Sequence, residues 1–412
     1  MKPVLLRLAG FTLLPLLALV LPFLLLPIIS RVVGAAGWSS ITSGQAIGVF
    51  AATIILWSWN ISGPVSIARS SSPQQRASIY SKSMRMRLVI AAVVLPLMSL
   101  VVALVAHDGY RLDAVTMAWS TALTGFSPAW FGIGTGQPRI LAVYDTFPRF
   151  CGALLSVPLI VATNQVWIYG VFALIATIVA SIAFHKRFGE AGTWFPRHPG
   201  TAVREIVPEA GTAAINFTGS AYASSPVPIA TATVPVATAT AGFASADSIY
   251  RFGLFSVVAV GNTFQSWTLE GNAEDARRRH AVALLTHLAL GAAGALGLGF
   301  LGPWASTILF SEVNKADTIT SVFYGLSFFF LSASTPLIRN LLIPAGHQKT
   351  VLTWTGLSAA VGVAFMVVAG LGSNVPGVAL GMAISEALLF FGLLLPAARL
   401  LPAKALPVTV DR

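Results

Sequence analysis

The sequence is poor in charge, in cysteine and in histidine. Only 9% of its 412 residues are charged, whereas a soluble domain carries roughly 25%, so a soluble globular domain is excluded. The single cysteine, Cys151, excludes a disulfide within the chain and any site built from several thiolates. The six histidines show no spacing typical of metal ligands. We therefore predict no metal site and no cofactor.

What the chain has in abundance is hydrophobic sequence, which makes up 56% of its residues. The first apolar run, residues 4–29, is too long for a signal peptide and no small-residue cleavage site follows it, so we expect a retained helix. The net charge of +11 does not indicate nucleic acid, because basic residues in a membrane protein mainly set its orientation. Nucleic acid is not a predicted partner.

Apolar runs of about 20 residues, each long enough to cross a bilayer, recur from end to end. We predict an all-α polytopic membrane protein with twelve transmembrane helices. The expected spans are 4–30, 41–63, 88–106, 114–135, 140–162, 167–184, 209–232, 243–265, 281–301, 319–338, 350–371 and 376–398. The seventh is the most polar, and we expect Pro226 and Pro228 to kink it.

The 25 Lys and Arg residues are distributed unevenly between the predicted loops. With the N-terminus in the cytoplasm, the outer loops hold Arg31, Arg111 and Lys315, and two further arginines fall within spans. All the other Lys and Arg residues lie on the cytoplasmic side. Because cytoplasmic loops of membrane proteins are enriched in Lys and Arg, we predict that both termini are cytoplasmic.

The chain contains a duplication. The segment AGWSSITSGQAIGVF (Ala36–Phe50) matches AGFASADSIYRFGLF (Ala241–Phe255) at an offset of about half the chain, and the pairs GQPR/GHQK and NQVWIYG/NVPG repeat it. Each half then holds six helices, so the halves are parallel repeats related by an axis along the membrane normal. We predict an N-terminal half at 1–205, a C-terminal half at 206–412, and a central cleft between them.

Two predicted spans carry an Asp and an Arg four residues apart, Asp145 with Arg149 and Asp247 with Arg251. At this spacing both side chains share a helix face. Each pair either lets its helix insert as an internal ion pair, or places its arginine in a hydrated cavity that binds an anion. Two guanidinium groups facing one cleft suit a diphosphate, because Arg binds phosphate oxygens in a bidentate manner.

Three further residues are candidates. Glu386 lies in the middle of the last span and is either a proton or sodium relay or a neutral hydrogen-bond partner between helices. Asn60 is a candidate substrate contact, with an interface hydrogen bond as the alternative. Arg31 is a candidate outer substrate contact or gate, with an interfacial anchor as the alternative.

Three segments carry a family resemblance: LPIISRVVGAAGW (Leu26–Trp38), WFGIGTGQPRI (Trp130–Ile140) and AGFASADSIYRF (Ala241–Phe252). Together they resemble the polysaccharide-transporter, or O-antigen flippase, branch of the multidrug/oligosaccharidyl-lipid/polysaccharide flippase superfamily. The resemblance implies alternating access and movement of a polyprenyl-diphosphate-linked oligosaccharide from the inner to the outer leaflet. By this analogy Arg149 and Arg251 contact the diphosphate or acidic sugars. Related chains often carry an acidic residue in the seventh helix, and here SSPVPIATATVP has none.

The resulting expectation is a flippase, not an enzyme, in the cytoplasmic membrane of a bacterium. Its partners are the lipid-linked oligosaccharide, membrane lipids and other polysaccharide-assembly proteins. A multidrug or other small-molecule or ion antiporter on the same fold is the main alternative, although it would be expected to keep more acidic cavity residues. A membrane polysaccharide polymerase or ligase is the weaker alternative, because the predicted outer loops are short and the longest cytoplasmic loops carry no paired-carboxylate motif.

Overall fold

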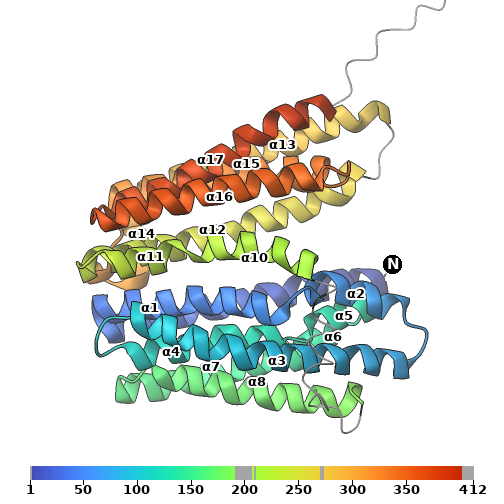
Figure 1. Ribbon diagram of the computed structural model, residues 1–412, viewed down its shortest axis with the longest axis horizontal. Helices are drawn as coiled ribbons and strands as arrows, with labels where there is room; N and C mark the ends of the chain where they lie inside the picture. The colour runs from blue at the N-terminus through green and yellow to red at the C-terminus, as the bar shows by residue number, and fades with distance from the viewer. Residues whose placement is uncertain (1, 191–206, 208–209, 270–272, 401–412) are drawn as a thin grey trace, which may run out of the picture. The chain divides into compact units, whose positions relative to one another are not determined.

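The structure is a computed structural model that describes residues 2–190, 207, 210–269 and 273–400. The described residues form helices and their connections, with no strand among them. By their internal contacts they divide into two compact units, shown in Figure 1. Unit 1 comprises Met1–Ala241 with Leu309–Asn314, and unit 2 comprises Gly242–Ile308 with Lys315–Arg412. The predicted boundary between halves, at residues 205 and 206, lies outside the described residues.

Unit 1 is built from a bundle of helices in which α1 packs on α3 and α4, and α8 on α4 and α7 (Figure 1). Its elements are α1 (Lys2–Leu56), α2 (Trp59–Arg69), α3 (Pro73–Val105), α4 (Arg111–Ala122), η1 (Leu123–Phe126), α5 (Ala129–Thr135), α6 (Pro138–Leu141), η2 (Ala142–Thr146), α7 (Phe147–Thr163), α8 (Trp167–Phe188), α10 (Ala210–Ser224) and α11 (Pro226–Thr233).

Unit 2 is also a bundle of helices, in which α15 packs on α13 and α17, and α16 on α17 (Figure 1). Its elements are α12 (Ala237–Leu269), α13 (Ala273–Leu296), η4 (Gly297–Leu301), α14 (Gly302–Phe310), α15 (Thr318–Pro336), η6 (Leu337–Leu342), α16 (Gln348–Leu371) and α17 (Val375–Leu400). The short η5 (Glu312–Asn314) belongs to unit 1, and α12 begins in unit 1.

The first two predicted spans, 4–30 and 41–63, both lie in α1 (Lys2–Leu56), which consists of two helices joined at a kink. The kink is at Gly34, where φ is 64° and the backbone is not helical. Gly34 lies between the two predicted spans, and glycine supplies the positive φ that the kink requires. The second break comes at Trp57, also at positive φ, before α2 begins at Trp59.

Nine helices of the described residues are long and apolar enough to cross a membrane. Three predicted spans account for the difference from twelve. The first and second merge across Gly34 and Trp57 into Leu25–Arg69, the fourth is broken into α4, η1 and α5, and the seventh into α10 and α11. The break at Ser225, before Pro226, agrees with the kink expected in the seventh span. The twelve-span count, the cleft and the cytoplasmic termini stay predictions.

A polar seam joins the second and seventh spans within unit 1. Ser43 donates to the Thr231 hydroxyl at 2.8 Å, the Thr53 and Ser220 hydroxyls lie 2.9 Å apart, and Asn216 donates to Asn60 at 3.3 Å. Such hydroxyl and amide bonds between helices are typical of packing in a membrane, where burial of apolar surface gives no driving force. The seam explains how a helix as polar as α10 is accommodated.

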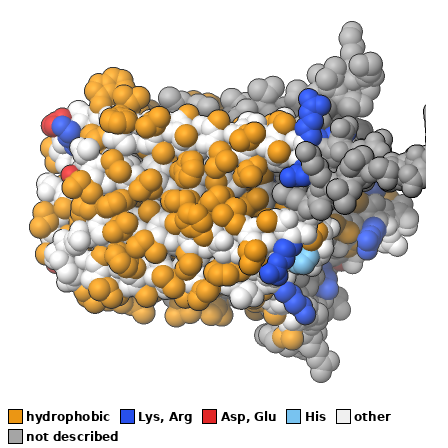
Figure 2. Space-filling model, turned by 90° about the horizontal axis from the view of Figure 1, so that it is seen from above, with side chains coloured by type: hydrophobic (Ala, Val, Ile, Leu, Met, Phe, Trp, Pro, Cys, Tyr) orange, Lys and Arg blue, Asp and Glu red, His pale blue; other side chains and the backbone are white. Residues whose placement is uncertain are grey.

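Large apolar side chains are exposed along helices of both units, among them Leu104 and Leu154 in unit 1 and Phe300 and Val368 in unit 2. Figure 2 shows hydrophobic side chains covering the face in view, with Lys and Arg gathered toward one end of it. Exposed apolar surface on this scale is not found on soluble monomers. It indicates that lipid covers these helices.

Candidate functional site

The first predicted charge pair is present in unit 1, on a distorted stretch of helix. Asp145 lies in the π-helical turn η2, and Arg149 lies one turn later in α7. The Arg149 guanidinium forms an ion pair with the Asp145 carboxylate and also donates from Nε to the Asp145 carbonyl at 3.1 Å. π-Helical turns inside α-helices are frequent at functional sites. The ion pair is only partly buried, so Arg149 remains accessible.

Arg149 and Asp145 line a small cavity of about 20 Å³, together with residues of η1 and α8. This cavity shares four lining residues with a larger groove of about 730 Å³ between α3, α4 and α8: Leu123, Phe126, Thr177 and Ser181. The groove is lined mainly by apolar side chains, among them Leu88, Leu95 and Ile178. An apolar groove of unit 1 therefore ends beside a charged pair.

The second predicted pair is present in unit 2, where it is part of a larger cluster. Arg251 donates from Nε to one carboxylate oxygen of Asp247 at 2.5 Å, and the Tyr324 hydroxyl donates to the other at 3.1 Å. Asp247 is 3% exposed, whereas the Arg251 side chain is 30% exposed. The buried carboxylate is thus paired, as a charge inside a membrane must be, and the arginine reaches the surface of unit 2.

Two further ionisable side chains meet this cluster. The Tyr250 ring packs on the Tyr324 ring at a centroid distance of 5.2 Å. Glu386, buried in α17, lies close enough to Tyr250 to interact with it electrostatically. α12, α15 and α17 therefore bring two carboxylates, one guanidinium and two phenols together inside unit 2. The sequence predicted each acidic residue but not their association, because Glu386 is far from Asp247 along the chain.

The first copy of the duplicated segment is neutral at this place. Thr42 and Ala46 stand where Asp247 and Arg251 stand in the second copy, and both are buried. The Thr42 hydroxyl donates back to the Trp38 carbonyl of its own helix at 2.8 Å. The shared packing of the duplicated segment therefore does not require a charge pair, which makes the Asp247–Arg251 pair specific to the C-terminal copy.

The remaining candidates lie on the surface of unit 1. Asn60 is exposed in α2, and its side-chain oxygen accepts from Asn216 of α10 at 3.3 Å. Arg31 is exposed within α1, before the bend at Gly34 and not beyond the end of a helix. Neither residue joins the cluster of its own unit around Arg149. Their roles as substrate contacts stay predictions.

Two arginine sites within helices were missed by the sequence analysis, which assigned both arginines to cytoplasmic loops. Arg87 is fully buried in α3 and donates to the Gly125 and Ser127 carbonyls at 3.2 and 3.3 Å. Arg339 lies in the π-helical η6 and donates to Asn262 at 2.8 Å. The signal for Arg87 was its helical spacing from Ser83 and Tyr80, which are also buried.

Among the residues that the structure describes, no three His, Cys, Asp or Glu side chains gather as a metal site requires. The site is instead made of charge pairs, phenols and apolar walls. Such a set can hold an anion or exchange a proton, and it offers no nucleophile paired with a base.

No protein-family model and no curated protein matches the chain. Among solved structures, MATE in complex with MaD3S is similar over 96% of this chain and 96% of its own, at 13% identity and a TM-score of 0.48. An outward-facing multidrug resistance MATE family transporter of the MOP superfamily is similar over 96% and 93%, at 15% identity and a TM-score of 0.45. A MOP superfamily transporter from Pyrococcus furiosus is similar over 98% and 95%, at 15% identity and a TM-score of 0.45. All three TM-scores lie below 0.5, so these likenesses do not by themselves show a family for this chain.

Proposed function

We propose that the protein is a flippase that moves a polyprenyl-diphosphate-linked oligosaccharide from the inner to the outer leaflet of a bacterial cytoplasmic membrane by alternating access. In this role it is a transporter and not an enzyme. It acts in surface polysaccharide biosynthesis, with the lipid-linked oligosaccharide and membrane lipids as its partners, together with other polysaccharide-assembly proteins.

The observation that carries the proposal is the groove of unit 1 that ends beside Arg149 and Asp145. A polyprenyl-diphosphate lipid has an apolar chain and an anionic head joined at one point. The groove offers walls that suit the chain, and the partly exposed Arg149 offers a donor that suits the phosphate oxygens. A water-soluble substrate makes no use of such a groove.

Arg251 gives unit 2 a comparable donor. Its Nε is engaged by Asp247, and its side chain is partly exposed, so its outer edge faces the surface of the unit. Arg is the residue best suited to bidentate phosphate contacts. In the proposed cycle, each unit thus contributes one arginine held in place by an aspartate four residues earlier.

A multidrug or other small-molecule or ion antiporter is the second candidate. The observation that favours it is the association of Asp247, Glu386 and two tyrosines inside unit 2. Buried carboxylates of this kind relay protons in membrane transporters. The same cluster is also compatible with proton coupling of the proposed flippase, so substrate specificity separates the two candidates.

The test is leaflet transfer of a fluorescent polyprenyl-diphosphate oligosaccharide in proteoliposomes, with variants of the groove and of its charged end. Ala92→Phe fills the groove, because Ala92 lines it, whereas Val93→Phe adds the same ring on the adjacent residue, which is exposed and outside the lining. We expect both Ala92→Phe and Arg149→Gln to slow transfer at least about tenfold. Ala92→Phe blocks the groove, and Arg149→Gln loses one charge-assisted contact, which is worth about this factor.

Val93→Phe should retain the wild-type rate, and the double variant Asp145→Asn/Arg149→Gln separates loss of charge from loss of folding. It keeps a polar pair at the same place, so it should fold and still fail to transfer the lipid. Wild-type transfer rates in Ala92→Phe and in the double variant would contradict the proposal.

A further inference from the structure

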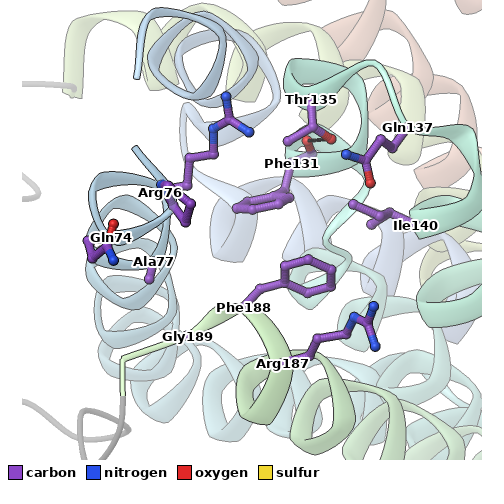
Figure 3. Close-up of a pocket in the computed structure, with 11 residues that line it drawn as sticks. Gln74, Arg76, Ala77, Phe131, Thr135, Gln137, Ile140, Arg187, Phe188 and Gly189 are labelled. Atoms are coloured by element: carbon purple, nitrogen blue, oxygen red, sulfur yellow. Dashed lines mark hydrogen bonds between the residues drawn. The ribbon is translucent and has the colours of Figure 1, made fainter. Parts of the chain in front are cut away.

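A pocket of about 320 Å³ lies in unit 1, outside the site described above, where three helix ends meet. Figure 3 shows the side chains that surround it. Gln74, Arg76 and Ala77 come from the start of α3, Thr135 and Gln137 from the end of α5 and the turn after it, and Arg187 and Phe188 from the end of α8. None of these residues lines the groove or the Arg149 cavity.

The pocket is cationic. Arg76 and Arg187 stand on two sides of it, and no Asp or Glu is among its described lining residues. Arg76 is oriented by Ser70, to which it donates from Nε at 3.0 Å and from a terminal nitrogen at 3.5 Å. The Arg187 guanidinium lies 5.6 Å from the centre of the Phe188 ring. Both arginines are thus held in place without a carboxylate in the pocket.

The wall between the arginines is aromatic. The rings of Phe131 and Phe188 lie side by side with centroids 5.4 Å apart, and Ile140 continues the apolar wall. Gln74, Gln137 and Thr135 add hydrogen-bonding groups. A ligand that fits this arrangement carries an anionic, oxygen-rich group beside a short apolar part.

The pocket also lies at the level where a membrane presents such ligands. The apolar sequence of α8 ends at Phe184, before His185, Lys186 and Arg187, and the apolar sequence of α3 begins at Leu88. The topology predicted from the charge distribution puts these helix ends on the cytoplasmic side. Anionic lipids gather at this surface, and basic pockets between helix ends there bind lipid headgroups.

We propose that this pocket binds the phosphate headgroup of an anionic phospholipid of the cytoplasmic leaflet. The two guanidinium groups contact the phosphate oxygens from opposite sides, and the glycerol and the start of the acyl chains lie against Phe131 and Phe188. Because α3, α5 and α8 all line the pocket, the bound lipid contacts the ends of all three helices and links them at this level.

The experiment measures lipid binding to the full-length protein in neutral detergent micelles by native mass spectrometry. Phosphatidylglycerol is titrated against wild type, Arg76→Gln, Arg187→Gln and the double variant, with phosphatidylcholine as the zwitterionic lipid and inorganic phosphate as the free anion. Arg139→Gln is the matched control, since Arg139 is exposed next to Gln137 but does not line the pocket.

We expect each single variant to weaken phosphatidylglycerol binding roughly tenfold, and the double variant more, because each loses one charge-assisted contact. Arg139→Gln should stay within about twofold of wild type, since Arg139 does not line the pocket and loses no contact with the phosphate. Equal losses in Arg139→Gln, or unchanged binding in the double variant, would overturn the proposal. So would competition by millimolar inorganic phosphate, which would identify a site for the free anion. Reduced lipid binding with normal leaflet transfer leaves the proposed function intact.

Discussion

At the scale of single residues, the cluster of unit 2 is centred on the Asp247 carboxylate, which accepts hydrogen bonds from side chains of two different helices. Arg251 comes from the same helix, while the Tyr324 hydroxyl comes from α15. A carboxylate buried in a membrane needs both contacts, because neither water nor lipid supplies a substitute. Removing either donor therefore leaves a charged oxygen unsatisfied.

Tyr324→Phe removes the hydroxyl donor and keeps the aromatic ring with its packing. We expect it to lower the free energy of unfolding by about 1–2 kcal/mol, the range for a hydrogen bond to a charged group inside a membrane. The measurement is thermal unfolding of the purified protein in detergent.

Tyr250→Phe is the matched control for this prediction. Tyr250 is buried against the same ring, and its hydroxyl has no hydrogen-bond partner among the described residues. Its removal should leave stability unchanged or slightly raised, because an unsatisfied polar group is lost. If both variants lost the same stability, the Tyr324–Asp247 bond would not be the source of the effect.

The sequence predicted the two Asp–Arg pairs, because a spacing of four residues on one helix face is local information. The structure adds Tyr324 and Glu386 to the second pair. Both are brought there by packing of α15 and α17 on α12 or on each other, which depends on contacts between residues far apart in sequence. No local pattern contains that information.

At the scale of elements, Arg87 explains how the break in the fourth predicted span is stabilised. The span passes from α4 through η1 to α5, with Ser127 and Pro128 between the last two. This break exposes the Gly125 and Ser127 carbonyls inside the unit, and Arg87 donates to both. The Arg87 guanidinium also lies 6.0 Å from the centre of the Phe126 ring and 5.9 Å from that of the Trp130 ring.

Arg87→Met should lower the free energy of unfolding by about 3 kcal/mol. Relief of the buried charge recovers about 3 kcal/mol, while two unpaired carbonyls cost about 1–3 kcal/mol each and the lost ring contacts about 1 kcal/mol each. Arg85→Met, at a less buried residue of the same helix, should change stability little. Thermal unfolding in detergent compares the two, and equal melting temperatures would show that Arg87 does not support the break.

The packing of α1 on α4 depends on two glycines spaced four residues apart, Gly44 and Gly48. A Cβ at Gly48 would lie 1.9 Å from the Thr121 hydroxyl oxygen and 2.4 Å from the Ala118 carbonyl oxygen. At Gly253, the equivalent position of the second copy, the nearest atom is a Phe328 ring carbon at 3.0 Å. Gly253→Ala is therefore a matched control for Gly48→Ala.

Gly48→Ala should lower stability by about 2–3 kcal/mol, since the backbones of α1 and α4 must separate to admit the methyl group. Gly253→Ala should cost less than about 1 kcal/mol, because the Phe328 ring can shift. Unfolding in detergent distinguishes them. A loss for Gly48→Ala no greater than that for Gly253→Ala would mean that the α1–α4 contact does not require glycine.

The sequence predicted where most helices lie. The apolar runs gave α8, α16 and α17 close to their observed bounds, and proline marked the break before Pro226. The kink at Gly34 falls between the first two predicted spans, because the apolar run of the first span ends before Arg31. The start of α3 at Pro73 was missed because its first turns carry charge and polar side chains.

At the scale of the whole molecule, each unit holds one of the two Asp–Arg pairs spaced four residues apart, but on different helices, α7 with η2 in unit 1 and α12 in unit 2. The predicted duplication, at an offset of about half the chain, therefore does not extend to these charged residues.

The central claim is that the substrate is an anionic lipid-linked oligosaccharide and not a cationic small molecule. The most direct test reconstitutes the wild-type protein in proteoliposomes and measures two activities side by side: leaflet transfer of a fluorescent undecaprenyl-diphosphate oligosaccharide, and proton- or sodium-driven export of a cationic dye. We predict leaflet transfer above that of protein-free vesicles and no dye export. Dye export without leaflet transfer by the folded protein would contradict the account.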